Sequence, residues 1–163
     1  MNNLNAVSEI TLTAIQNIPE INPGDEIASI INQCIEAQEC SLKNNDVLVI
    51  AQKIISKSED RFVDLKTVKP SEKALKVSKE VDKDPRLVEL ILQESNQIIR
   101  ASKGILVVEH KLGHILANAG IDRSNVGRTD DHVLLLPKNP DESAQNIKNY
   151  FEHNSKIKIG VLI

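Results

Sequence analysis

Basic and hydroxyl side chains follow an apolar run in the first third of the sequence. The run VLVIA, residues 47–51, is followed by Gln52 and Lys53 and then by Ser56 and Lys57. Ligands of α/β sheets commonly bind outside the carboxyl ends of strands, where two lysines and a hydroxyl can hold a polyphosphate through point charges. The same spacing is also typical of a solvated strand end, so both interpretations stay open.

Two more polar groups stand out, one farther along the sequence at residues 120–125 and one nearer the N-terminus at residues 18–21. In residues 120–125 (GIDRSN), Asp122 and Asn125 are three residues apart and follow a glycine that lets the backbone approach a ligand. A carboxylate and an amide suit a hard, oxygen-coordinated cation with a nucleotide beside it. Residues of these types are also common in turns that bind nothing. Residues 18–21 (IPEI) are by themselves typical of a rigid connector.

Other pairs of reactive side chains give weaker signals. His110 and His114 are four residues apart, but we expect them on a hairpin, where this spacing does not favour a metal site. Cys34 and Cys40 are six residues apart across a helix end, and we expect two unpaired thiols. The GxGxxG, GxxxxGK[ST], HExxH and CxxC motifs do not occur.

The elements that must position these residues follow from hydrophobic periodicity and turn signals. Their order predicts an α+β domain over residues 1–163, with a mixed sheet and flanking helices. A glycine, Gly113, is expected in the turn of a hairpin. The expected strands are residues 9–15, 47–51 (buried on both faces), 61–65, 104–110, 114–118, 133–137 and 157–163, and the expected helices have caps at Asp25, Ser71, Asp84 and Asn139.

The composition limits the class of protein. Apolar residues make up 40% of the 163 residues but aromatic residues only 2%, so the core must be aliphatic. The shortage of aromatic side chains and the net charge of −3 argue against nucleic-acid binding. No run approaches the roughly 18–20 apolar residues of a membrane span, and the N-terminus lacks the pattern of a signal peptide. We expect a cytoplasmic protein without nucleic-acid or membrane partners.

Five ordered blocks of the sequence together resemble one enzyme family. They are IPEINPGDE, NNDVLVIAQKIISKSEDRFVDL, KDPRLVELILQES, GILVVEHKLGHILANAGIDRSN and VLLLPKNPDESA. In this order they are similar to coenzyme F420-0:γ-glutamyl ligases from about Leu12 to Ile163, and AQKIISK and ANAGIDRSN are the most specific parts. The resemblance implies the fold of that family. It also implies a GTP-dependent reaction that joins L-glutamate to the terminal carboxylate of F420-0, a deazaflavin, through an acyl phosphate.

The resemblance implies roles for individual residues but identifies no catalytic side chain. It implies a homodimer, and a divalent metal, Mg²⁺ or Mn²⁺, that would neutralise phosphate charge and orient the transfer. K⁺ is a further cofactor that it implies. Ile18, Pro19, Glu20 and Ile21 would line the guanine nucleotide pocket, Gln52, Lys53, Lys57 and Asn125 would contact the nucleotide, and Asp122 would hold the divalent metal.

The sequence departs from the family pattern in two places. Residues 58–60 (SED) stand where the family often has a small residue and glycine, so the turn there is expected to differ. After the strand IGVLI the family continues with a Ser-Asp-Thr or Ser-Asp-Ser segment that bears further metal ligands, whereas this sequence ends at Ile163. We therefore expect the N-terminal part of such a ligase, inactive alone, with Asp122 as a lone carboxylate. Two alternatives stay open: a non-catalytic nucleotide-binding or structural module, and a ligase for another carboxylate.

Overall fold

The structure is a computed structural model that describes residues 10–123 and 131–163. Its helices and short strands form an α+β fold, as predicted. The helices are α1 (Ile27–Ala37), α2 (Gln52–Ser58), α3 (Glu72–Val81), α4 (Pro85–Gln93) and α5 (Pro140–Asn154), with two 3₁₀ turns, η1 (Leu65–Thr67) and η2 (Asn118–Gly120). The strands are β1 (Val47–Val49), β2 (Phe62–Asp64), β3 (Ser95–Ser102), β4 (Ile105–His110), β5 (Ile115–Ala117), β6 (His132–Leu134) and β7 (Gly160–Leu162).

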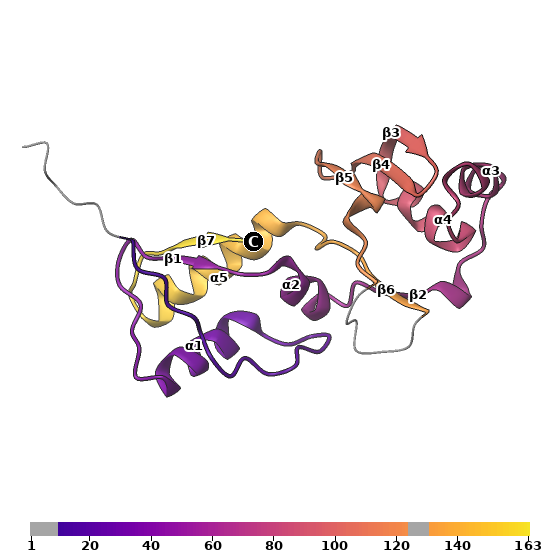
Figure 1. Ribbon diagram of the computed structural model, residues 1–163. Coiled ribbons are helices and arrows are strands. Elements are labelled where there is room, and N and C mark those ends of the chain that lie inside the picture. Colours follow the sequence, from indigo (N-terminus) through magenta and orange to yellow (C-terminus); the bar gives the residue numbers. More distant parts are fainter. Residues whose placement is uncertain (1–9, 124–130) are drawn as a thin grey trace, which may run out of the picture.

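The strands pair in three small sheets. β1 pairs in parallel with β7, β2 pairs antiparallel with β6, and β3, β4 and β5 form an antiparallel sheet. Figure 1 shows the β1–β7 pair with α1 and α5 in one half of the molecule and β3–β5 with α3 and α4 in the other. The β2–β6 pair, next to α2, joins the two halves.

Each half has a core in which aliphatic side chains predominate, as the composition predicts. Around α3, α4 and the β3–β5 sheet, the side chains of Val88, Ile91 and Val108 are completely buried. The other core brings Ile55 of α2 together with Phe151 of α5. α4 contributes buried residues along most of its length, so it is an internal helix of this half. Among the described residues, no helix is both long and apolar enough to cross a membrane.

Local capping and turn signals in the sequence are mostly confirmed. The side chains of Ser71, Asp84 and Asn139 each accept a hydrogen bond from a backbone N–H in the first turn of their helices. Gly113 has φ +85° in the short connection between β4 and β5, where a left-handed backbone favours glycine. These residues act through neighbours only a few positions away, so the sequence pattern is sufficient to identify them.

The predicted strand over residues 9–15 is wrong for the part of it that the structure describes. Residues 10–15 form no strand, and the side chains of Ile10 and Leu12 are 86% and 91% exposed. Alternating apolar residues form a strand only where another strand pairs with their backbone, and none of the described strands does so. The Gln38 side chain instead donates a hydrogen bond to Ala14 O within this segment and accepts one from Gln16 N just after it.

The strand that precedes the lysines is buried on one face. Leu48 is buried, whereas Val47 and Val49 are largely exposed. β1 pairs with β7 alone in the described part of the chain, and its outer face is left open there, so the prediction of burial on both faces is wrong. The residues after it, Gln52–Ser58, form a helix that the sequence analysis did not predict.

Two further predictions of local structure need correction. α1 begins after Glu26, which makes no side-chain cap, while Asp25 accepts a hydrogen bond from Asn22 N at 2.8 Å. The prediction of Asp25 as the cap is therefore wrong, because its carboxylate is used in the preceding turn. β3 was not predicted either, since its burial does not alternate and its pairing with β4 contains irregularities in register.

Candidate functional site

The helix α2 carries the basic side chains that the sequence analysis identified. It starts directly after Ala51, whose backbone is extended (φ −63°, ψ 129°) and belongs to the short connection from β1. Lys53 and Lys57 are four residues apart, so both lie on one face of the helix. Lys57 is only 8% exposed. On the same helix Gln52 Oε1 accepts a hydrogen bond from Ser56 Oγ at 3.0 Å.

Each of the two lysines forms an ion pair with a carboxylate from another predicted polar group. Lys53 Nζ lies 2.6 Å from Asp122 Oδ2. Lys57 Nζ forms an ion pair with Glu20 Oε1 and donates a hydrogen bond to it. The structure therefore brings together polar groups that are 37 residues or more apart in the sequence. Asn125, the remaining predicted nucleotide contact, lies outside the described residues.

The segment 18–21 divides its side chains between the core and the surface. Ile21 is buried in the core beside α1, and Ile18 packs partly against the same cluster. Pro19 and Glu20 are exposed. If this segment contacts a nucleotide, it does so chiefly through its backbone and these two exposed side chains, because the isoleucines are already used in packing.

Asp122 is held next to β6 by the backbone. Its N–H donates to Leu134 O at 2.9 Å, and its carbonyl accepts from Leu134 N at 2.8 Å. Just before it, the three residues of η2 have φ values of 51°, 54° and 68°, a left-handed conformation that is strained for residues other than glycine. A Cβ on Gly120 would lie 3.0 Å from side-chain atoms of Leu136. The left-handed conformation therefore favours glycine at this position, and a side chain there would also require Leu136 to shift.

The described residues suit a divalent metal that is shared with nucleotide phosphates better than a metal held by protein ligands alone. Across residues 10–123 and 131–163, no three His, Cys, Asp or Glu side chains group closely enough to hold a metal ion. The predicted ligand Asp122 is engaged by Lys53. Mg²⁺ is usually held by one or two carboxylates together with substrate phosphates. Asp122 therefore fits a metal that a nucleotide helps to bind, and the described residues do not form a cage that would bind the metal alone.

The histidines and cysteines that gave weaker signals in the sequence lie outside the lysine–carboxylate site. His110 is 3% exposed, and its Nδ1 accepts a hydrogen bond from Leu112 N at 2.9 Å. This imidazole nitrogen is occupied, and His110 and His114 belong to no metal-binding group in the described part of the chain. Cys34 and Cys40 are both free, which confirms the prediction of unpaired thiols.

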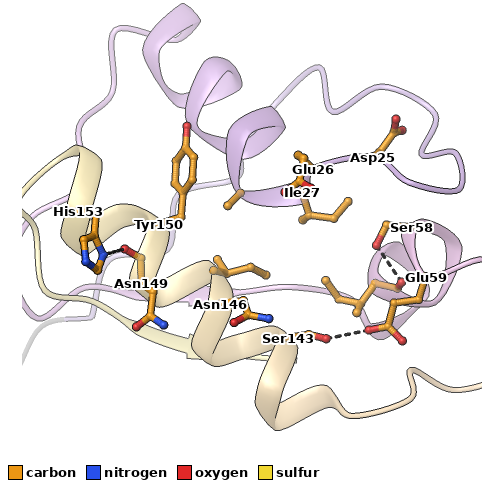
Figure 2. Close-up of a pocket in the computed structure, with 13 residues that line it drawn as sticks. Asp25, Glu26, Ile27, Ser58, Glu59, Ser143, Asn146, Asn149, Tyr150 and His153 are labelled. Atoms are coloured by element: carbon orange, nitrogen blue, oxygen red, sulfur yellow. Dashed lines mark hydrogen bonds between the residues drawn. The ribbon is translucent and has the colours of Figure 1, made fainter.

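A separate cavity of about 410 Å³ lies between α1, α2 and α5 (Figure 2). Asp25 and Glu26 lie on one side of it, and Asn149 and His153 of α5 lie on the other. None of the predicted site residues lines this cavity. Near α2 it is lined by Ile55 and Ser58 of the helix and by Glu59, which directly follows the helix. The cavity and the lysine–carboxylate site are therefore distinct.

Sequence reasoning missed two charged residues beside the site. Arg61, three residues beyond α2, donates a hydrogen bond from Nη2 to Glu94 Oε2 at 2.7 Å, and both side chains are largely buried. The signal available in the sequence was an arginine at the start of an apolar strand, where a buried charge needs a counter-charge. The partner could not be identified from the sequence because it is 33 residues away.

Comparison with known families identifies the class of protein. Residues 16–163 match the family model for F420-0:γ-glutamyl ligase. The chain therefore belongs to the F420-0:γ-glutamyl ligase family, which confirms the resemblance found in the sequence.

Individual relatives agree with the family match. The coenzyme F420:L-glutamate ligase of Methanothermobacter thermautotrophicus is 38% identical over 154 residues, which cover 94% of this chain and 60% of the relative. The protein of that name from Methanococcus maripaludis is 42% identical over 122 residues, 75% of this chain and 48% of the relative. The one from Methanopyrus kandleri is 34% identical over 144 residues, 88% and 54% of the two chains. The chain thus spans about half to three-fifths of the length of these relatives.

The surroundings of His110 determine how its charge responds to pH. Burial of the imidazole lowers the pKa of His110 below its ordinary value of 6.5. The carboxylate of Glu94, 3.8 Å from His110 Nε2, opposes this shift, whereas the neighbouring charges of His114, Arg61 and Lys111 add to it. His110 is therefore neutral in the folded protein at neutral pH.

We predict that His110 makes the protein less stable as the pH falls below about 7. The unfolded chain takes up a proton near pH 6.5, whereas folded His110 does so only at lower pH, so the free energy of unfolding decreases through this range. Urea unfolding at pH 7.5, 6.5 and 5.5 measures this loss. His110→Asn, which keeps an acceptor for Leu112 N, should flatten the dependence, and the exposed control His153→Gln should not. An unchanged pH slope in His110→Asn would contradict the prediction.

Proposed function

We propose that the α2 site, formed by Lys53, Lys57, Glu20 and Asp122, binds GTP for the ligation of L-glutamate to coenzyme F420-0. The observation that carries this proposal is the pairing of Lys53 with Asp122 and of Lys57 with Glu20, which gathers the described polar groups at one place. The relatives are named coenzyme F420:L-glutamate ligases, and this supports the choice of substrates. In the proposed reaction the γ-phosphate passes to the F420-0 carboxylate. The amine of glutamate then displaces phosphate to form the amide.

Lys57 is the phosphate contact that the geometry favours most. Its side chain is 10% exposed, while that of its partner Glu20 is 72% exposed. A buried ammonium retains a counter-charge because an uncompensated buried charge is costly. A phosphate oxygen can take the position of the Glu20 carboxylate, which can move into solvent while the ammonium stays in place. This exchange keeps the charge of the Lys57 ammonium compensated as the nucleotide enters.

Lys53 and Asp122 can exchange partners in the same way. When the lysine turns to a phosphate, the carboxylate becomes available to Mg²⁺ or Mn²⁺, with Gln52 and Asn125 as further nucleotide contacts. A metal held by Asp122 and phosphate oxygens would neutralise the phosphate charge. We therefore expect metal affinity to depend on bound nucleotide. K⁺ stays a prediction of the resemblance.

The first test measures GTP binding to the 163-residue chain by calorimetry in the presence of Mn²⁺. We expect Lys57→Ala to weaken binding about 10-fold or more, the loss of one charge-assisted hydrogen bond. Glu20→Gln should strengthen binding about threefold or more, because it removes the charge that competes with phosphate. Lys79→Ala, an exposed lysine of α3, serves as the control and should have no effect. Weaker binding in Glu20→Gln, or no binding by the unmodified chain, would contradict the proposal that GTP binds at this site.

The second test concerns turnover. We propose that this chain alone does not complete the ligation, because the described residues offer no grouped metal ligands. GDP release that depends on F420-0 and glutamate is the measurement, with the Methanothermobacter thermautotrophicus relative assayed in parallel as the positive control. We expect GTP binding without turnover. Turnover by this chain at a rate comparable to that of the relative would contradict the proposal.

We also propose that the chain forms a homodimer, as the resemblance implies. The apolar helix α4 does not support this, because its apolar residues are buried within the chain. Support comes from the outer face of the β1–β7 pair, where Val47, Val49 and Leu162 are 61%, 67% and 59% exposed. Parallel sheets are normally covered on both faces.

The dimer is tested by light scattering coupled to size exclusion over a range of protein concentrations. We expect a dimer that Val49→Asp converts to monomer, since a buried unpaired carboxylate destabilises an apolar interface. The control Ile99→Asp places the same charge at an exposed apolar position of β3 and should leave the dimer intact. A monomer at every concentration would contradict the proposal.

A further inference from the structure

Arg61 connects the end of α2 to the chain that follows β6. Its N–H donates to Ser56 O at 2.9 Å, and its carbonyl accepts from Leu135 N at 3.0 Å. Its Nε donates to Leu136 O at 2.8 Å. These three hydrogen bonds join α2 to a segment about 75 residues away in the sequence. Arg61 thus helps to hold α2 beside residues 134–136, together with the β2–β6 pairing and the hydrogen bond from Lys138 N to Glu59 Oε2.

The other end of the guanidinium is fixed by Glu94, which follows α4. The two side chains are 18% and 17% exposed, so their 2.7 Å charge-assisted hydrogen bond is partly shielded from water. Glu94 is itself anchored, because its carbonyl accepts from Lys111 N at 3.0 Å. Nearby, His110 Nε2 is buried and has no hydrogen-bond partner within the described part of the chain. The arginine fork therefore has two fixed acceptors, one in each direction.

The two ion pairs of the candidate site depend on this connection differently. Asp122 is attached to Leu134 by two backbone hydrogen bonds, so its distance from Lys53 depends on how α2 lies against residues 134–136. The Lys57–Glu20 pair does not cross that boundary. The loop that carries Glu20 is tied to α2 itself, because Gly24 N donates to Ser58 O at 2.8 Å.

We propose that Arg61 is a positioning residue of the α2 site, and that Glu94 holds its guanidinium in the plane needed to reach Leu136 O. The Arg61 side chain donates to Leu136 O and to Glu94 Oε2, and it acts on the Lys53–Asp122 pair through these two contacts. A lysine at this position keeps the charge but lacks the planar fork that reaches two acceptors in fixed directions. The consequence for nucleotide binding rests on the proposed function, whereas the consequence for the Lys53–Asp122 geometry does not.

The geometric consequence can be tested without a ligand. A carbodiimide activates a carboxylate, and an adjacent lysine amine then forms an amide with net loss of water, so the yield of each cross-linked peptide reports an ion pair. In Arg61→Gln we expect the Lys53–Asp122 cross-link to fall about three- to tenfold, the effect of losing hydrogen bonds of ordinary net strength. The Lys57–Glu20 cross-link should stay within about twofold of the unmodified chain.

Further variants separate positioning from general destabilisation. Glu94→Gln keeps an acceptor oxygen and should retain most of the Lys53–Asp122 yield. Arg61→Lys should lose it as Arg61→Gln does. Arg86→Gln, at an arginine that pairs with Asp84 at 2.7 Å, is the matched control and should change neither cross-link. If Arg61→Gln does not fold by circular dichroism, Arg61→Lys carries the same comparison.

The outcomes test the positioning role of Arg61 and the proposed function separately. Equal Lys53–Asp122 yields in the unmodified chain and in the Arg61 variants would overturn the positioning role, and so would an equal loss of both cross-links. Titration with GTP and Mn²⁺ is the second measurement, and we expect the Arg61 variants to bind about three- to tenfold more weakly. If the unmodified chain binds no GTP while the cross-link falls selectively, the proposed function fails and the positioning role stands.

Discussion

The need of a buried ammonium for a counter-charge is the constraint on which this site depends. Lys57 is almost fully buried, and its ion pair with Glu20 compensates its charge. An isolated charge in such surroundings would be costly, so the loop that carries Glu20 must stay against α2. Packing supports the same arrangement, because Ile21 from this loop and Ile55 from α2 belong to one core. Electrostatics and the hydrophobic effect therefore fix the loop from two sides.

The same constraint explains why the structure is suited to a charged ligand. The two pairs, Lys53 with Asp122 and Lys57 with Glu20, leave these four charges balanced. An incoming polyphosphate with its cation can exchange partners with them, and no step then leaves a buried charge without compensation. In this respect ion pairs formed within the protein would prepare the site for the proposed nucleotide, since they hold the lysines in place at the face where phosphates would bind.

Local features of this chain could be predicted from the sequence, whereas features that depend on distant partners could not. The caps at Ser71 and Asp84 and the left-handed turn at Gly113 rest on nearby residues. The strand expected over residues 9–15 was wrong because alternation does not supply a pairing strand. The residues of the candidate site were proposed together because the family resemblance carries long-range information that spacing does not. Arg61 was missed because its two side-chain acceptors are 33 and 75 residues away.

Leu136 contacts both sides of the site. Its side chain lies against Gly120, where a Cβ would approach it to 3.0 Å, and its carbonyl accepts the hydrogen bond from Arg61 Nε. The strained left-handed turn before Asp122 and the connection to α2 therefore meet at one residue. Because backbone strain persists only where surrounding structure determines it, this shared contact offers a physical reason why the turn keeps Asp122 at the distance that its pairing with Lys53 requires.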